Sequence, residues 1–210
     1  MITSFSLIMG IISFLLSISI FRKYSSTPEV TSLLISVNIG TYFLISPNLI
    51  SADSSVLLAY GSSGFYLASG RFETLITSIF LHANLLHLFL NMYALYILGK
   101  VVEISLGRVR YAVLYFASGL SGNLLSAIAD SKAVGVGASG AVMGLLGYMI
   151  ATEYKLTGKL NPSTVFIAIF VIFGGFSANV DVLAHLGGFS LGLIWGLSRG
   201  VKLHYETSYW

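Results

Sequence analysis

The sequence contains no cysteine, and only 9% of its residues are charged. The absence of cysteine excludes disulfide frameworks and thiolate metal sites. A soluble domain carries about 25% charged residues, so this chain is neither an ordinary cytosolic globule nor a disordered tail. Its net charge is only +3 and its basic residues form no patch, which excludes a nucleic-acid binder. With 56% hydrophobic residues and a mean hydropathy of +0.88, the composition predicts an integral membrane protein.

Long apolar runs predict an all-α fold, a polytopic helix bundle in the lipid bilayer. A span needs about 20 mostly apolar residues, and runs this apolar must be helical because lipid offers the backbone no hydrogen-bond partners. The runs show no ten-residue alternation, which excludes a barrel. We expect seven spans: Ser4–Phe21, Val30–Ile45, Ile79–Leu98, Tyr111–Ala129, Val136–Ala151, Ser163–Phe176 and Val182–Leu197.

The Lys and Arg residues predict the orientation, because cytoplasmic loops are enriched in them. Nine lie on one side of the expected membrane and only two, Arg71 and Lys132, on the other. We therefore expect a cytoplasmic C-terminus, an external N-terminus and a location in the cell membrane. The first span could be a signal peptide, but its basic residues, Arg22 and Lys23, follow the apolar run, as they do in a retained anchor. The nine are Arg22, Lys23, Lys100, Arg108, Arg110, Lys155, Lys159, Arg199 and Lys202.

The longest connection, from Ser46 to Ser78, mixes polar turns with apolar stretches. We expect it to fold and to lie partly in the membrane interface, a depth that suits its aromatic residues. These are Tyr60, Phe65, Tyr66 and Phe72.

Polar residues inside the spans are costly to bury and therefore informative. His82 is interpreted as a residue at a helix mouth that ties down the outer loop. His87 and Asn91 are four residues apart, so they share one helix face in the outer half of the third span. Taken alone, the pair is best explained as hydrogen bonds between helices.

Ser139 lies in the string Gly137-Ala138-Ser139-Gly140 at the outer start of the fifth span. Free N–H groups and the helix dipole favour a developing negative charge there. Gly137 permits a tight turn, and Gly140 permits close approach of another backbone. A simple N-cap serine remains an equal alternative at this point.

Glycine stripes on two spans predict that these helices pack closely. Gly140, Gly144 and Gly147 form one stripe; His185, Gly188, Gly192 and Gly196 form the other. Both spans run inward, so packing them together brings Ser139 and His185 to the same depth. A hydroxyl beside an imidazole is a nucleophile–base pair.

A tetrahedral intermediate also needs oxyanion donors. The N–H groups of Ser139 and Ala138 and the side chains of His87 and Asn91 are the candidates. No carboxylate lies within the apolar parts of the spans. Asp181, one turn before His185, could orient the imidazole, but we expect solvent to satisfy it. The working unit is then a Ser–His dyad.

At this point the sequence resembles the rhomboid family of intramembrane serine proteases. The resemblance rests on HANLLHLFLN (82–91), Leu98-Gly99, Glu103 to Gly107, GASG (137–140) and AHLGG (184–188) with Gly192, in order over about residues 30–200. It implies a six-helix core with Ser139 as nucleophile, His185 as general base, and His87 and Asn91 as oxyanion donors. His82, Gly137, Gly140, Gly188 and Gly192 would support the site, and Glu103 and Gly107 would form a structural turn on the inner side.

Two departures accompany the resemblance. Glu73-Thr74 stands where the family often has Trp-Arg, and a first span precedes the six-helix core. We expect three parts: an N-terminal transmembrane helix with a basic linker (1–27), a rhomboid-like protease core (28–200) and a cytoplasmic tail (201–210).

A nucleophile below the outer surface predicts substrates that are single-span membrane proteins, cut near the outer face, with no cofactor and no metal. Phe166, Phe170, Phe173 and Phe176 form an aromatic face on the sixth span, interpreted as packing or lipid contact rather than a gate. Two alternatives remain: an inactive relative that binds transmembrane helices, and a transporter or proton channel. The latter is disfavoured because the third, fifth and seventh spans carry no ionisable residue between Asn91 and the cytoplasmic charges.

Overall fold

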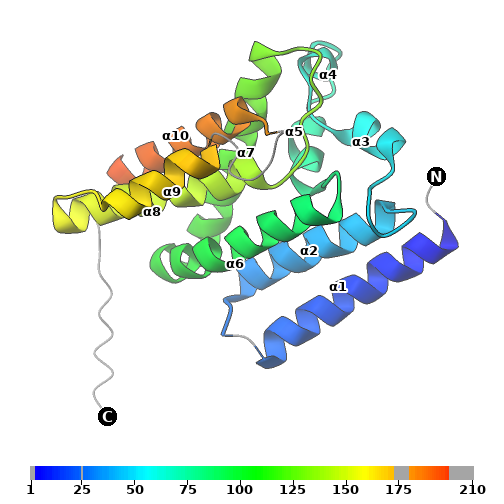
Figure 1. The fold of residues 1–210 in the computed structure, drawn as a ribbon, viewed down its shortest axis with the longest axis horizontal. Coiled ribbons are helices and arrows are strands. Elements are labelled where there is room, and N and C mark those ends of the chain that lie inside the picture. Colours follow the sequence, from blue (N-terminus) through cyan, green and yellow to red (C-terminus); the bar gives the residue numbers. More distant parts are fainter. Residues whose placement is uncertain (1–2, 25, 173–179, 199–210) are drawn as a thin grey trace.

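The computed structural model describes residues 3–24, 26–172 and 180–198, which form an all-helical bundle (Figure 1). Each expected span corresponds to one of the longer helices, and the connection from Ser46 to Ser78 folds into short ones. The long helices are α1 (Ser4–Tyr24), α2 (Glu29–Ile45), α6 (Leu85–Leu106), α7 (Arg108–Ala129), α8 (Ser139–Thr157), α9 (Pro162–Ile172) and α10 (Val182–Ser198). The short ones are α3 (Ser54–Tyr60), α4 (Gly64–Ala68), α5 (Thr74–Thr77) and the 3₁₀ turn η1 (Ser78–Phe80).

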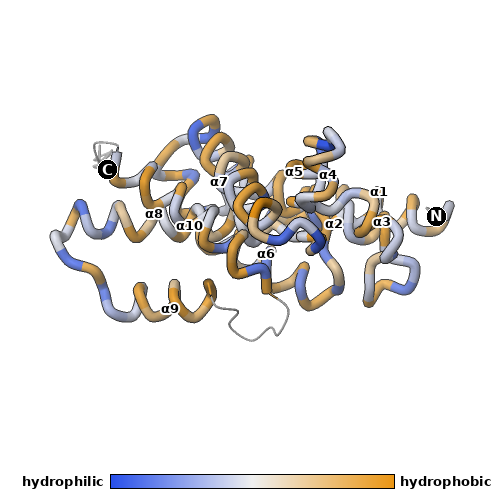
Figure 2. Tube along the Cα trace, turned by 90° about the horizontal axis from the view of Figure 1, so that it is seen from above, coloured by the Kyte–Doolittle hydropathy of each residue, from blue (hydrophilic) through white to orange (hydrophobic). Residues whose placement is uncertain are grey.

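Three helices in the described part of the chain are long and apolar enough to cross a membrane: Ser4–Lys23, Leu85–Leu106 and Arg108–Ala129. Glu29–Ile45, Pro162–Ile172 and Val182–Ser198 are also apolar but shorter. In Figure 2, α9 is orange over most of its length, which reflects the apolar run from Val165 to Ile172. The prediction of a membrane helix bundle is therefore confirmed.

The start of the third span was predicted wrongly. The apolar run begins at Ile79, but α6 begins at Leu85 because Asn84 caps it, accepting a hydrogen bond from the His87 N–H at 2.8 Å. The preceding residues form η1 and an extended segment, in which the Ala83 carbonyl accepts from the Ala52 N–H at 3.0 Å. Hydropathy alone could not reveal η1 and the extended segment, because they lie within the same apolar run as α6.

Helix α8 lies at the centre of the bundle, where α6, α7 and α10 all pack against it. Its contact with α10 is the most extensive between any two described helices, as the two glycine stripes predicted. A Cβ on Gly188 would collide with the Gly140 carbonyl oxygen, and a Cβ on Gly192 with that of Gly144. The two backbones therefore touch directly. Helix α1 instead lies at the edge of the bundle beside α2 (Figure 1).

The first turn of α2 is held by a carboxylate from another helix. Glu103, on α6, is buried and accepts hydrogen bonds from the N–H groups of Val30 (3.0 Å) and Thr31 (2.7 Å) and from the Thr31 hydroxyl (2.7 Å). The Tyr111 hydroxyl lies 3.1 Å from Thr31 Oγ1. Four residues on, Gly107 has a φ of +77°, which ends α6 and starts α7 at once. Glu103 thus joins α2 to α6.

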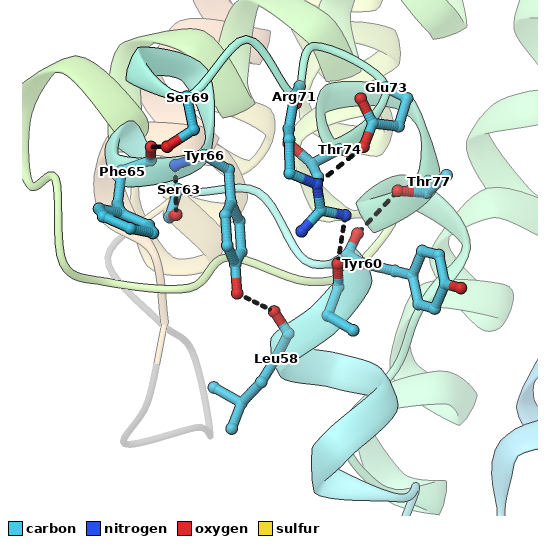
Figure 3. Close-up of polar contacts among 11 residues, drawn as sticks. Leu58, Tyr60, Ser63, Phe65, Tyr66, Ser69, Arg71, Glu73, Thr74 and Thr77 are labelled. Atoms are coloured by element: carbon cyan, nitrogen blue, oxygen red, sulfur yellow. Dashed lines mark hydrogen bonds and ion pairs between the residues drawn. The ribbon is translucent and has the colours of Figure 1, made fainter. Parts of the chain in front are cut away.

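The connection from Ser46 to Ser78 is folded, as expected, around Arg71 (Figure 3). Arg71 Nη2 donates to the Ala59 carbonyl at 2.6 Å, Nε donates to Glu73 at 3.0 Å, and the guanidinium lies 4.6 Å from the centre of the Tyr66 ring. The Tyr66 hydroxyl donates to the Leu58 carbonyl. Arg71 therefore joins the end of α3 to the segment after α4.

Candidate active site

Ser139 is the first residue of α8, and its hydroxyl is not used as a helix cap. Ala138 holds the N-cap position, and no side chain caps α8. The alternative of an N-cap serine is therefore wrong. Within the described residues the Ser139 hydroxyl makes no hydrogen bond, so it remains available to a base.

Gly137 holds the turn before Ser139 in a conformation that suits glycine, with a φ of +127°. A Cβ on Gly137 would also lie only 2.8 Å from His87 Cε1 and 2.9 Å from His87 Nε2. Ser139 Oγ is 3.8 Å from the same point. The His87 imidazole and the Ser139 hydroxyl therefore both lie within 4 Å of the position that a Gly137 Cβ would take.

His185 lies in the first turn of α10 and is 6% exposed. Its Nδ1 is 3.1 Å from the carbonyl oxygen of Ile172 on α9. Because a carbonyl only accepts, Nδ1 carries the proton of the neutral ring, and Nε2 carries the lone pair of a base. Sequence analysis missed Ile172, since a backbone acceptor can be supplied by any residue type.

The close packing of α8 and α10 brings the neighbours of Ser139 and His185 into contact. A Cβ on Gly140, directly after Ser139, would lie 3.3 Å from the carbonyl oxygen of Ala184, directly before His185. The candidate nucleophile and base are thus attached to backbone that meets at one end of the helix pair.

The remaining candidate donors lie close by. Asn91 is 7% exposed, and its Nδ2 donates to the His87 carbonyl at 2.9 Å, which leaves a second N–H on the amide. His82 is fully buried, and its ring packs edge-on against that of His87. Its Nε2 accepts from the Ala138 N–H at 3.5 Å. The Ala138 N–H could therefore donate to an oxyanion only if it gave up its hydrogen bond to His82. The Ser139 N–H has no such partner among the described residues.

Asp181 is satisfied by the protein rather than left to solvent, so that expectation was wrong. Its Oδ1 accepts from the Ala184 N–H at 2.9 Å, and its Oδ2 accepts from the Ser126 hydroxyl on α7. An Asp directly before a helix commonly caps it by accepting a hydrogen bond from an N–H group of the first turn. The position of Asp181 before Val182 could therefore have predicted its hydrogen bond with Ala184.

The aromatic face on the sixth span is described only in part. The rings of Phe166 and Phe170 stack, with centroids 6.2 Å apart, on an outward side of α9. Phe173 and Phe176 lie outside the described residues. The described ranges contain no cluster of His, Asp and Glu suited to a metal ion.

Comparisons with known proteins identify the family of the chain. The family model of the rhomboid domain matches residues 69–201, which include Ser139, His185, His87 and Asn91. The chain belongs to the rhomboid family, whose typical members are intramembrane serine proteases, and it is an integral membrane protein.

Individual relatives include both plant and bacterial proteins. RHOMBOID-like protein 1 of Arabidopsis thaliana is 38% identical over 62% of this chain and 35% of its own length. In Bacillus subtilis, rhomboid protease GluP is 32% identical over 77% of this chain and 33% of its own length. The putative rhomboid protease YdcA of the same organism is 32% identical over 68% of this chain and 78% of its own length. The chain thus spans well under half the length of the first two relatives and most of the third.

Proposed function

We propose that this protein is an intramembrane serine endopeptidase that cuts single-span membrane proteins near the outer membrane face. The observation that supports it best is the position of Ser139 at the start of α8, where its hydroxyl caps no helix, next to the first turn of α10, which carries a His185 held by the Ile172 carbonyl. Rhomboid relatives named as proteases support the same class of reaction.

The first half of the proposed reaction forms an acyl-enzyme. Ser139 Oγ attacks the scissile carbonyl carbon while His185 Nε2 takes its proton, which leaves an oxyanion on the tetrahedral intermediate. The Ser139 N–H and the side chains of His87 and Asn91 are the proposed donors to this oxyanion. Collapse of the intermediate breaks the C–N bond, and the His185 proton passes to the leaving amine.

Water completes the cycle by the same groups. His185 Nε2 takes a proton from water as the water oxygen attacks the ester carbon. Collapse of the second intermediate breaks the bond from this carbon to Ser139 Oγ, which takes the proton back from His185, and the carboxylic acid is released. The Ile172 carbonyl keeps the ring in one tautomer and accepts from Nδ1–H when the imidazolium forms. In this proposal it performs the orienting role that a carboxylate has in a triad.

The orientation of the chain sets where the substrate is cut. The excess of Lys and Arg at the other ends of the helices supports an outward-facing site. Because the carbonyls of a helix are already hydrogen-bonded and sterically covered, we expect cleavage where a substrate helix is weak near its outer end.

Fluorophosphonate labelling of the detergent-purified protein tests the proposal. We expect wild type to be labelled and to cleave a model transmembrane substrate, and Ser139→Ala to do neither while unfolding at the same temperature. Cleavage that persists in Ser139→Ala would refute the dyad. A folded wild type that is neither labelled nor active would instead favour an inactive, helix-binding relative.

A further inference from the structure

Asp181 holds the backbone from which His185 projects. Its Oδ1 accepts from the Ala184 N–H at 2.9 Å, and its backbone carbonyl accepts from the His185 N–H at 3.0 Å. Asp181 therefore binds the backbone N–H groups of both Ala184 and His185. The geometry of this turn decides the direction in which the imidazole leaves the helix.

The same carboxylate also joins this turn to two other parts of the site. Its Oδ2 accepts from the Ser126 hydroxyl, near the outer end of α7. A Cβ on Gly135, in the segment that leads to Ser139, would lie 3.3 Å from Oδ2. That segment is itself fixed by two backbone hydrogen bonds between Gly135 and Ser62, at 2.9 and 2.8 Å. Asp181 is thus at the junction of α7, α10 and the approach to α8.

We propose that Asp181, held by Ser126, is a positioning residue that fixes the first turn of α10 and thereby places His185 relative to Ser139. This inference rests on the proposed function. The proposed action of Asp181 is through the backbone, because Nδ1 of His185 is already bound to the Ile172 carbonyl and the carboxylate makes its hydrogen bonds elsewhere. Asp181 is therefore not the third member of a triad.

Loss of the Asp181 carboxylate and its hydrogen bonds should slow the chemical step more than it weakens substrate binding. The hydrogen bonds of Asp181 go to the backbone N–H groups of Ala184 and His185 and to the Ser126 hydroxyl, and none of these three groups binds the peptide in the proposed reaction. Small displacements of a reacting group have large effects on rate, and 1 Å can cost about a hundredfold. We expect a partial displacement to reduce the rate about tenfold.

The test compares variants of the full chain in detergent, below the temperature at which any of them unfolds. Two rates are measured: fluorophosphonate labelling of Ser139, which needs no transmembrane substrate, and cleavage of a model substrate with kcat and KM separated. Asp181→Ala should lower the labelling rate and kcat about tenfold with little change in KM. Asp181→Asn keeps an oxygen for Ala184 and an N–H for Ser126, and should restore most of the rate. Ser126→Ala should show a smaller loss than Asp181→Ala.

Asp53→Ala is the matched control. It also removes an Asp cap, that of α3, whose Ser55 N–H is bound at 2.8 Å, but it leaves α10 unchanged. We expect Asp53→Ala to be labelled at the wild-type rate. An equal loss in Asp53→Ala would attribute the effect to general destabilisation and overturn the proposal.

The remaining outcomes separate this inference from the proposed function. A wild type that is not labelled at Ser139 refutes the protease proposal itself. Normal labelling of wild type and of folded Asp181→Ala overturns only the role of Asp181. Should Asp181→Ala not fold, the other two variants decide: an unchanged rate in Ser126→Ala, or a tenfold loss in Asp181→Asn, contradicts positioning through these hydrogen bonds.

Discussion

The imidazole of His87 occupies the space in which a side chain on Gly137 would begin. One position in the turn before Ser139 therefore serves two requirements: a positive φ and room for a proposed oxyanion donor. The imidazole is the end of a side chain and can rotate away from an added methyl group.

Gly137→Ala should consequently reduce activity more than stability. The added methyl group should displace the His87 ring from Ser139, and we expect at least about a hundredfold loss of turnover, the scale of losing one oxyanion donor. Gly70→Ala is the control, because Gly70 also has a positive φ (+80°) but nothing within 4 Å of its Cβ position. Both variants are compared by thermal unfolding and by cleavage of a model substrate. Equal activity in the two would argue against a role for His87.

Gly188→Ala should destabilise the bundle through the contact between α8 and α10. Its methyl group meets the Gly140 carbonyl, a backbone atom that cannot move without separating the helices, and we expect a loss of about 2 kcal/mol in the free energy of unfolding.

Gly140→Ala is the control on the same interface. Its nearest contact is looser, 3.3 Å from the Ala184 carbonyl, and its loss should be clearly smaller. Unfolding in mixed detergent micelles measures both, and a larger loss in Gly140→Ala would contradict the packing described above.

Glu103→Gln should also destabilise the protein, by about 2 kcal/mol, because a buried carboxylate accepts hydrogen bonds from the start of α2 and an amide cannot replace all of them. Glu29→Gln removes a comparable charge from the exposed ion pair with Arg108, at 2.7 Å, and should cost less than about 1 kcal/mol. The two free energies of unfolding are measured at the same pH. Similar values would show that Glu103 does not act as a buried cap.

Arg71→Ala should loosen the connection from Ser46 to Ser78. The substitution removes the hydrogen bond to Ala59, the contact with Tyr66 and the ion pair with Glu73, so limited proteolysis within residues 46–78 should become several times faster. Glu73→Gln removes only the exposed ion pair and should change the rate little. Equal acceleration by both variants would mean that the ion pair, rather than Arg71 itself, holds this region.

The features that sequence predicted well are those that repeat along a helix. Apolar runs predicted the seven long helices, and the spacing of Gly140, Gly144, Gly188 and Gly192 predicted which two helices touch. Sequence placed Ser139 at the start of its helix but could not distinguish a nucleophile from a cap. The structure shows that Ser139 does not cap its helix. The catalytic roles proposed for four residues stay predictions: Ser139, His185, His87 and Asn91.

Contacts made by the backbone or by a single residue could not be predicted in the same way. The Ile172 carbonyl beside His185 has no residue-type signal, and the start of α6 at Leu85 depends on Asn84 and on pairing with a distant loop. Glu73-Thr74 in place of Trp-Arg left the anchoring of that loop open, and only the folded chain shows Arg71 joining α3 to it.

The cap on α2 has a consequence for the order in which the chain assembles. Glu103 follows Thr31 by 72 residues, so the N–H groups at the start of α2 have no carboxylate partner while the intervening chain is still being synthesised. Helices α1 and α2 pack against each other without using α6, whereas the hydrogen bonds from the first turn of α2 to Glu103 can form only after α6 has been synthesised. The last hydrogen bonds of the first helical hairpin are therefore made by a part of the protein that is translated much later.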